Sequence, residues 1–537
     1  MTRVIAASST GTAFEWYDFF IFGSLTPIIA KTFLAGLDPT SALIAALALF
    51  AVGFAFRPLG AIIFGAMGDR VGRKATFLTT VSLMGGATFA IGLLPTYASA
   101  GIVAPILLVF LRICQGTALG GEYGGAAIYV AEHSPDHKRG AATGWIQSSA
   151  SFGLLAALLV IVVTRTALGE DAFNAWGWRI PFLASSILLA ISVWMRVKLS
   201  ESPTFAKLRD EGELTKAPLR EAFARKESLK QVLIAFFAIM CAQGAVWYFT
   251  FFYLQVFLEK SLGLPAATKD FLLIAMTLVS APLYVFFGWL SDRVGRKPVM
   301  LGGMLLALAL YFPGSHLIAA STNPALVEAQ RASPVVVVTD PASCAVQFDP
   351  TGTRRFDSAC DIAKSLLVAR GIAYRTVAAT DGATTIRVGN SALGVAGGEA
   401  LDDPGLKASK SAIGDSLKAQ LVAAGYPASA APNAVHYPTL LTILFLFVVA
   451  ATALYGPQAA ALVEMFPTRI RYTALSLPYH IGTGWVGGFL PVTSFAIVAI
   501  TGDIYAGLWY AVGFTALSAV VTIFFLKETR GKSLEAC

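Results

Sequence analysis

Long apolar runs make up most of the chain, and short polar loops separate them. A helix needs about 20 apolar residues to cross a hydrocarbon core about 30 Å thick. Such runs predict twelve transmembrane helices, over residues 12–34, 41–66, 76–96, 103–130, 141–164, 178–198, 231–257, 270–290, 299–320, 439–463, 473–500 and 504–526. The pattern therefore predicts an all-α polytopic membrane protein.

One segment, residues 321–437, breaks the apolar pattern. The runs Val335–Val338 and Ala383–Val388 predict strands, and amphipathic stretches near Asp361–Arg370 and Ser416–Ala424 predict helices. We therefore expect a small inserted α+β domain. Because it falls between the ninth and tenth predicted helices, it is expected on the extracytoplasmic, periplasmic side.

A repeated motif locates this insertion independently. "GAMGDRVGRK" at 65–74 matches "GWLSDRVGRK" at 288–297 with an offset of 223 residues, whereas "EHSPDHKR" at 132–139 matches "EMFPTRIR" at 464–471 with an offset of 332. The second half therefore resembles the first plus 109 residues, as in a parallel repeat of two six-helix bundles. The expected divisions are an N-terminal bundle (1–200), a cytoplasmic linker (201–230), a C-terminal bundle in two parts (231–320 and 438–526), the inserted domain (321–437) and a cytoplasmic tail (527–537).

Composition and charge support a membrane protein. The chain is 56% hydrophobic and 13% charged, with a mean hydropathy of +0.68, and a soluble protein carries nearly twice that charged fraction. The net charge of +8 does not indicate nucleic-acid binding, because Lys and Arg concentrate in alternate loops. By the positive-inside rule, both termini and the loop at 196–230 are expected in the cytoplasm.

Ionisable residues inside the predicted helices are few and lie in the N-terminal half: Glu15, Asp18, Arg57, Arg112 and Glu122. Such charges are costly in a membrane and usually face a cavity or a partner. In the fourth helix, Arg112, Gln115, Leu119 and Glu122 share one face. That face is expected to line a cavity.

We expect Asp18 and Arg112 to form a proton-coupling pair, since a carboxylate beside a guanidinium can alternate between ion-paired and protonated states. A permanent structural ion pair is the alternative. Glu122 and Glu15 are alternative proton acceptors, although Glu122 could instead make a hydrogen bond in helix packing.

Arg57 is a candidate for binding a substrate carboxylate, which a guanidinium matches with two hydrogen bonds; it could equally be the counter-ion of Glu15 or Asp18. Arg112 and Gln115 are further candidates. The C-terminal half offers aromatic, amide and imidazole groups that could line a midplane site: Gln243, Trp247, Tyr248, Tyr479 and His480. Aromatic residues in such helices also pack against lipid or neighbouring helices, and His480 could make only a structural hydrogen bond.

Several stretches narrow the class of protein: "FEWYDFF", "FRPLGAIIFGAMGDRVGRK", "LRICQGTALGGEYGGA", "GWRIPF" and "EMFPTRIRYTALSLPY". With them the chain, apart from the insertion, resembles the major facilitator superfamily, and within it the metabolite:proton symporter branch, whose members carry citrate, 2-oxoglutarate, shikimate, and proline or betaine. The resemblance implies alternating access with the proton as coupling ion and no other cofactor. It also supports an acid on the first helix near an Arg on the fourth.

The resemblance further implies that the repeated motif forms cytoplasmic latches, which close when the carrier faces outward. Glycines at 72 and 295 are expected in tight turns, and Asp69 and Asp292 are expected to accept hydrogen bonds at a neighbouring helix N-terminus. We expect Arg73 to pair with Glu132 and Arg296 with Glu464. Gly65 belongs to the same motif.

Cys344 and Cys360 both lie in the inserted segment, where an oxidising periplasm would permit a disulfide; two free thiols are the alternative. The sequence contains no enzyme motif and no metal-ligand spacing. We therefore expect a proton symporter for a small organic acid in the bacterial inner membrane. Alternatives are a carrier of a zwitterionic osmolyte of the proline or betaine type, and a transporter-like sensor. The inserted domain could also be an oligomerisation or partner-docking module, with a partner that the sequence does not identify.

Overall fold

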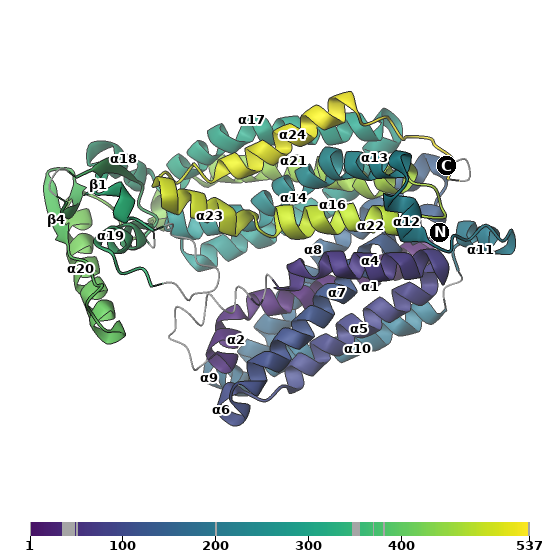
Figure 1. Cartoon of the computed structure of the whole chain (residues 1–537), viewed down its shortest axis with the longest axis horizontal. Helices are drawn as coiled ribbons and strands as arrows, with labels where there is room; N and C mark the ends of the chain where they lie inside the picture. Colours follow the sequence, from purple (N-terminus) through teal and green to yellow (C-terminus); the bar gives the residue numbers. More distant parts are fainter. Residues whose placement is uncertain are drawn as a thin grey trace.

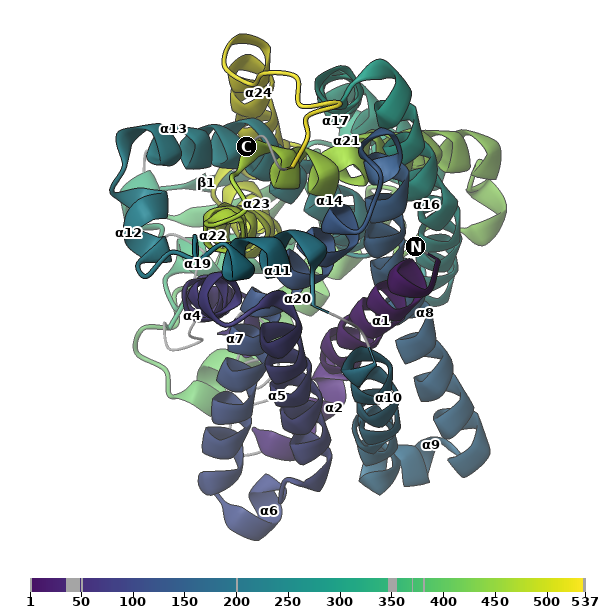
Figure 2. The same cartoon turned by 90° about the vertical axis from the view of Figure 1, so that its right-hand side faces the viewer.

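The computed structural model describes residues 2–34, 49, 52–198, 201–345, 355–368, 370–379 and 382–534. Two helical bundles lie side by side, and a small sheet domain lies at one end of them (Figure 1). Both chain termini lie at the opposite end of the bundles. Figure 2, viewed from the end with the termini, shows the N-terminal half below and the C-terminal half above.

The N-terminal half is formed by helices that follow the predicted apolar runs: α1 (Thr2–Ser24), α2 (Thr26–Phe33), α4 (Arg57–Arg70), α5 (Arg73–Leu93), α6 (Tyr97–Ala100), α7 (Val103–Glu132), α8 (Arg139–Leu168), α9 (Glu170–Ala172) and α10 (Arg179–Val197). Part of the second predicted helix, residues 41–48, 50 and 51, lies outside the described residues. Two short helices, α11 (Pro203–Asp210) and α12 (Pro218–Phe223), form the linker to the second half.

The C-terminal half contains α13 (Lys226–Ile234), α14 (Cys241–Tyr248), α15 (Leu254–Val256), α16 (Ala266–Val294), α17 (Arg296–Thr322), α21 (Tyr437–Met465), α22 (Arg471–Ile481), α23 (Leu490–Thr501) and α24 (Leu508–Phe524). Within the described residues, nine helical stretches are long and apolar enough to cross a membrane, and they coincide with the third to eleventh predicted helices. The seventh runs from Lys226 to Ser261 and includes three π-helical segments. Such segments are rare and often lie at functional sites.

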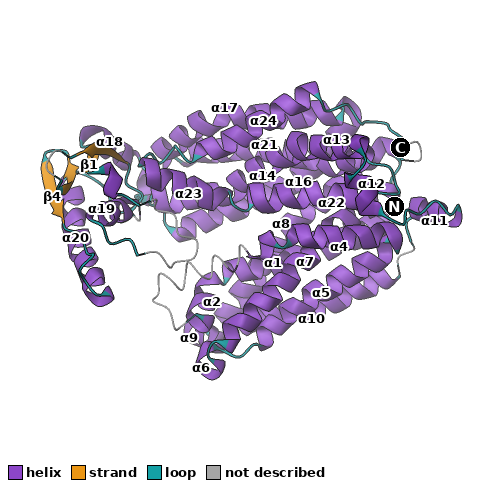
Figure 3. Cartoon of the chain, viewed as in Figure 1, coloured by secondary structure: helices purple, strands orange, loops and turns teal. Residues whose placement is uncertain are grey.

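Within the part of the chain that the structure describes, strands lie only in the sheet domain (Figure 3). The domain comprises α18 (Pro324–Ala332), β1 (Val335–Thr339), α19 (Ala359–Val368), β2 (Tyr374–Ala378), β3 (Thr384–Val388), β4 (Ser391–Val395) and α20 (Asp403–Ala423). Its strand order is β2-β1-β3-β4, with β1 parallel to β2 and the other pairs antiparallel. A disulfide joins Cys344, which follows β1, to Cys360 in α19, with their Cα atoms 5.2 Å apart.

The sheet domain is docked on the outer ends of the C-terminal half. The Tyr374 N–H donates to the Gly502 carbonyl (2.9 Å), and the Ala430 N–H donates to the Gly263 carbonyl (2.9 Å). The Asn323 amide donates to the Leu262 carbonyl (2.9 Å). Among the described residues, all hydrogen bonds between this domain and the bundles go to the C-terminal half.

Two glycines make the turns between paired helices. Gly72 precedes α5 with φ 127°, and Gly295 precedes α17 with φ 121°. These backbone conformations strongly favour glycine because it has no Cβ. The turn predicted from the repeated motif is therefore confirmed in both halves.

Candidate functional site

The repeated motif forms a charged cluster between the two halves at the end that bears the termini. We define the charged cluster by four residues of each half: Asp69, Arg73, Glu132 and Arg139, with Asp292, Arg296, Glu464 and Arg471. Their side chains are almost fully buried.

The two motif aspartates hold helices of the opposite half. Asp69 accepts hydrogen bonds from the N–H groups of Tyr472 (3.2 Å) and Thr473 (2.8 Å), at the start of α22. Asp292 accepts from the N–H groups of Gly140 and Ala141 (both 2.8 Å), at the start of α8. A carboxylate at a helix N-terminus satisfies free N–H groups and is favoured by the helix dipole.

The arginines and glutamates pair both within and between the halves. Arg296 lies 3.1 Å from Glu464, whereas Arg73 and Glu132 are 3.9 Å apart. Shorter contacts cross the interface: Arg139 lies 2.8 Å from Glu464, and Arg471 lies 2.7 Å from Glu132. Arg139 and Arg471 belong to the basic loops that the positive-inside rule explains, and their contacts across the interface were not predicted from the sequence.

Two further glutamates, Glu201 and Glu528, contact the charged cluster. Glu201 accepts the Arg73 N–H (3.1 Å), and Glu528 accepts the N–H groups of Arg296 (2.9 Å) and Lys297 (3.1 Å). The residues that follow these two glutamates, Ser202 and Thr529, also make equivalent contacts. The Ser202 hydroxyl donates a hydrogen bond to Glu132, and the Thr529 hydroxyl donates one to Glu464. The short match between "ES" at 201–202 and "ET" at 528–529 is the signal that could have found them.

Close helix approach in the motif depends on glycine. Gly65 of α4 lies against the backbone of Thr473 in α22, and its repeat counterpart Gly288 lies against the Gly140 carbonyl. A Cβ at Gly288 would overlap the Gly140 carbonyl oxygen, whereas a Cβ at Gly65 would make a tight contact with the Thr473 backbone.

A small cavity lies near the middle of the bundles, where the halves meet. It is lined by Thr12, Glu15, Trp16, Arg57, Leu119, Tyr123, Tyr479 and His480. A larger cavity lies between the sheet domain and the C-terminal half, but its lining is mostly apolar. Ligand sites are larger and combine apolar walls with a few converging polar groups. The central cavity has this kind of lining, and its volume of about 10 Å³ has room for about one water molecule in this structure.

Arg57 is the most unusual residue of the central cavity. Its side chain is buried, and neither Nε nor Nη2 has a hydrogen-bond partner among the described residues. Its guanidinium carbon lies 4.4 Å from the ring centre of Phe54 and 5.0 Å from that of Phe19. The alternative in which Arg57 pairs with Glu15 or Asp18 is wrong within the described residues, since neither pair comes within ion-pair distance. A buried guanidinium with free donors is suited to an anionic ligand group.

His480 and Tyr479 of α22 complete the cavity from the C-terminal half. Neither ring nitrogen of the buried His480 has a hydrogen-bond partner among the described residues. The ring of Tyr479 stacks on Tyr123 across the interface at 3.6 Å, and its hydroxyl lies 3.0 Å from that of Tyr455. Both halves therefore contribute polar groups to one site.

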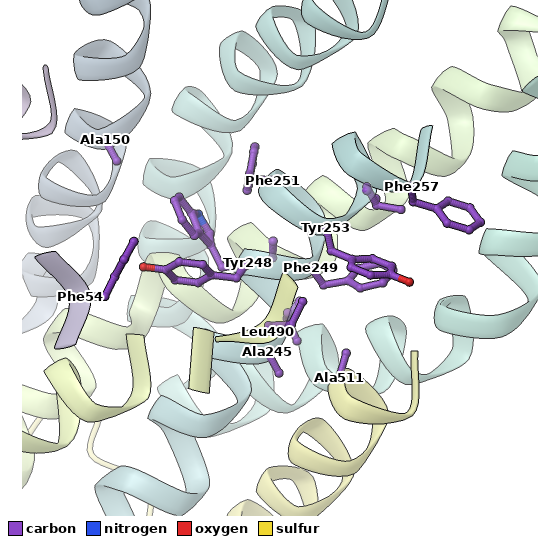
Figure 4. Close-up of a cluster of buried hydrophobic side chains, with 14 of the residues drawn as sticks. Phe54, Ala150, Ala245, Tyr248, Phe249, Phe251, Tyr253, Phe257, Leu490 and Ala511 are labelled. Atoms are coloured by element: carbon purple, nitrogen blue, oxygen red, sulfur yellow. The ribbon is translucent and has the colours of Figure 1, made fainter. Parts of the chain in front are cut away.

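Aromatic side chains continue this contact beside the cavity. The Trp16 and Trp247 rings are 6.2 Å apart, and the Tyr248 ring lies 5.9 Å from Phe54. Figure 4 shows the Tyr248 hydroxyl pointing toward Phe54, away from the inner cluster of the C-terminal half. Gln243 is buried in the same helix, α14, and does not line the cavity.

The expected ion pair between Asp18 and Arg112 is not formed among the described residues, and their expected part in proton coupling remains a prediction. Asp18 makes no ion pair among the described residues, and Thr88 is the side chain that hydrogen-bonds to it. Arg112 donates instead to Gln115 (2.8 Å), which donates to the Thr88 hydroxyl (2.8 Å). Among the described residues, Gln115 and Thr88 lie between the acid and the guanidinium.

The other two acids share a partner that the sequence analysis assigned to a loop. Arg196, in the last turn of α10, lies 2.9 Å from Glu15 and 2.7 Å from Glu122. Its guanidinium carbon also lies 3.5 Å from the ring centre of Phe77. The predicted sixth helix, residues 178–198, already included Arg196, but the residue was counted only with the basic loop at 196–230.

Known families match both parts of the chain. A model of the Major Facilitator Superfamily matches residues 9–335, and a model described as "Sugar (and other) transporter" matches residues 417–537. The chain belongs to the Major Facilitator Superfamily. This is a family of transporters and not of enzymes, as the sequence predicted.

Curated relatives are similar over the larger part of the chain. A proline/betaine transporter of Salmonella typhimurium is 36% identical over 326 residues, covering 59% of this chain and 65% of the relative. The glycine betaine/proline/ectoine/pipecolic acid transporter OusA of Dickeya dadantii is 36% identical over 327 residues, with the same coverage. The match thus spans just under two thirds of these relatives' length.

A solved structure of the proton:xylose symporter XylE, bound to 6-bromo-6-deoxy-D-glucose, has a similar fold. Its TM-score is 0.64 at 15% sequence identity, covering 99% of this chain and 97% of the symporter. At this identity the similarity concerns the fold alone.

Proposed function

We propose that the protein is a proton-coupled symporter of a small zwitterionic osmolyte of the proline or betaine type, working by alternating access. The observation that carries this proposal is the buried Arg57 guanidinium, whose free donors lie in a cavity lined by both halves. From the sequence alone an organic acid was the expected substrate, and a zwitterionic osmolyte was the alternative. The relatives named above support the alternative.

A zwitterion matches both chemical features of the cavity region. Its carboxylate suits the Arg57 guanidinium, which can donate two parallel hydrogen bonds. Its cationic nitrogen suits the faces of Trp16, Trp247 and Tyr248, because aromatic rings attract cations. A di- or tricarboxylate would bring a second negative charge to these rings without a matching cation.

We also propose a twelve-helix topology in the bacterial inner membrane, with both termini and the linker in the cytoplasm and the sheet domain in the periplasm. The sheet domain lies at the end opposite to the termini (Figure 1). Its disulfide suits an oxidising compartment. The charged cluster would then close the cytoplasmic side.

In this mechanism the two halves rock about the central cavity. Closing the charged cluster holds the halves together on the cytoplasmic side, and breaking the Arg139–Glu464 and Arg471–Glu132 contacts opens that side. The proton is the only coupling ion required.

The test is uptake by the purified full chain in proteoliposomes with an inward proton gradient. The panel contains proline, betaine, and mono-, di- and tricarboxylates. We expect gradient-dependent accumulation of proline or betaine, which a protonophore abolishes. Accumulation of carboxylic acids alone would overturn the zwitterion, and gradient-independent uptake would overturn proton symport.

Substitution of Arg57 tests the assigned site. R57K keeps the positive charge but loses the two-pronged donor, so we expect at least a tenfold rise in KM, and R57Q should abolish uptake. R165K is the matched control, because Arg165 is half-exposed on the outside of α8. Unchanged uptake by R57Q would overturn the assignment.

A further inference from the structure

One guanidinium nitrogen in the N-terminal half holds two carboxylates. Arg196 Nη2 lies 2.9 Å from Glu15 Oε1 and 2.7 Å from Glu122 Oε1, and none of the three side chains is more than 2% exposed. They come from α10, α1 and α7. We call Glu15 and Glu122 the acid pair.

The acid pair carries one negative charge too many for its partner. If both carboxylates are ionised, the three groups have a net charge of −1 in an apolar interior, where unpaired charge is strongly disfavoured. One added proton makes the group neutral. Two carboxylates that share a site take up protons as a unit.

The two acids differ in their remaining hydrogen bonds. Glu122 Oε2 accepts from the Thr80 hydroxyl at 2.7 Å. Glu15 Oε2 is buried and has no hydrogen-bond partner among the described residues. Glu15 also lines the central cavity beside Arg57 and His480. Glu15 is therefore the acid with both a free oxygen and a position next to the proposed substrate site.

We propose that the acid pair, bridged by Arg196, binds the coupling proton, with Glu15 as the acid that receives it from the cavity. The inference rests on the proposed proton symport. A proton from hydronium forms an O–H bond on Glu15, and Arg196 keeps its ion pair with Glu122. On the other side of the membrane, the same O–H bond breaks and the proton leaves to water. Arg196 is a positioning residue.

Other charged or titratable groups face this site. The cavity presents Arg57, Tyr123, Tyr479 and His480, and Tyr472 of α22 interacts with Glu122. Of these, His480 is the group that ordinarily titrates near neutral pH, so its imidazole is one competitor for the proton. Asp18 is the competing acid, on the next turn of α1.

Gly11 of α1 leaves room for the Arg196 guanidinium that bridges the acid pair. A Cβ at this position would overlap Arg196 Nη2. G11A should therefore displace the guanidinium without removing any charge, and it tests positioning separately from chemistry.

Infrared difference spectroscopy across a pH titration of the full chain tests the proposal without any substrate. We expect a titrating band of a protonated carboxyl group that is lost in E15Q, altered in E122Q and retained in D18N. G11A should shift the midpoint of that titration. A band that survives in both E15Q and E122Q would overturn the proposal.

Transport supplies a second readout. In proteoliposomes, E15Q should lose uphill uptake but retain counterflow exchange, which also demonstrates that the variant is folded. D18N should keep the proton-to-substrate ratio of the unmodified protein. Loss of proton coupling in D18N, with coupling retained in E15Q, would overturn the assignment. Because the infrared test needs no substrate, its outcome is separate from failure of the proposed symport.

Discussion

Arg139 of α8 lies 2.8 Å from Glu464 of α21, so an arginine of the N-terminal half is paired with a glutamate of the C-terminal half. The equivalent residues of the repeat make the reverse contact, Arg471 to Glu132, at 2.7 Å. Each half therefore contributes one arginine and one glutamate to a pair of ion pairs across the interface.

Removing the Glu464 carboxylate should weaken the contact between the two halves at the charged cluster, because Glu464 pairs with both Arg139 and Arg296. E464Q leaves Arg139 and Arg296 buried beside a neutral amide, and breaking such a buried pair costs about 3–5 kcal/mol. We expect the halves to separate at the end bearing the termini. Spin labels at the exposed Lys138 and Lys527 would record a longer distance, and an unchanged distance would contradict this role.

The motif aspartates allow a matched pair of variants. D69A removes the acceptor for the N–H groups of Tyr472 and Thr473, and D292A removes the corresponding acceptor at α8. Hydrogen bonds to a charged group contribute about 1.5–3 kcal/mol, so both variants should shift the protein toward the inward-open state. Cysteine labelling from each side of the membrane measures this shift. D171A, at an exposed position on α9, is the control and should have no effect.

The disulfide should stabilise the sheet domain locally. The bonded cysteines are separated by 16 positions, and a loop of that length corresponds to about 3 kcal/mol. In C344A/C360A we expect faster hydrogen exchange in peptides from 324–434 and unchanged exchange in the bundles. C114A is the control. Equal exchange in the two proteins would mean that the bond contributes no stability.

Docking of the sheet domain depends on Gly502. Its φ is +77°, and a Cβ there would overlap the Tyr374 carbonyl oxygen; Gly425 has a similar φ of +86° but open space around it. Both alanine variants carry the same backbone strain, about 1–2 kcal/mol. Only G502A should loosen the domain from α23, which limited proteolysis would detect. Equal cleavage of G502A and G425A would show that the contact does not matter.

Lys364 should make the stability of the sheet domain depend on pH. Burial lowers the pKa of its ammonium below the ordinary value, and Asp361 opposes this shift only in part. Between the folded and unfolded pKa values the unfolded chain binds more protons, so stability should rise with pH in that window. K364M should be more stable at neutral pH and lose the rise. Hydrogen exchange at neutral and alkaline pH measures both effects.

The sequence predicted the helical halves, the turns at Gly72 and Gly295, and the Asp residues at helix starts, because apolar length and repeated motifs are local signals. It did not predict β2 and β4, because their residues are mostly exposed and lack the buried alternation of β1 and β3. The repeat also identifies Arg139 and Arg471 as equivalent, but it does not show whether each arginine pairs within its own half or with the other.

The central site shows a second limit. Asp18 and Arg112 were paired because opposite charges are rare in predicted helices, but the rotation of each helix about its axis is not encoded in such a pattern. Arg196 was overlooked because the positive-inside rule already accounts for an arginine at a helix end. Only the packing of α10 against α5 and α1 shows that the Arg196 side chain turns inward, toward Glu15 and Glu122.

The attachment of the sheet domain has a mechanical consequence. Among the described residues, the hydrogen bonds between this domain and the bundles all go to the C-terminal half. The domain and that half should therefore move together as one unit. A partner that binds the domain and holds it in place would immobilise the C-terminal half as well. Alternating access would then become a swing of the N-terminal half alone against a fixed support.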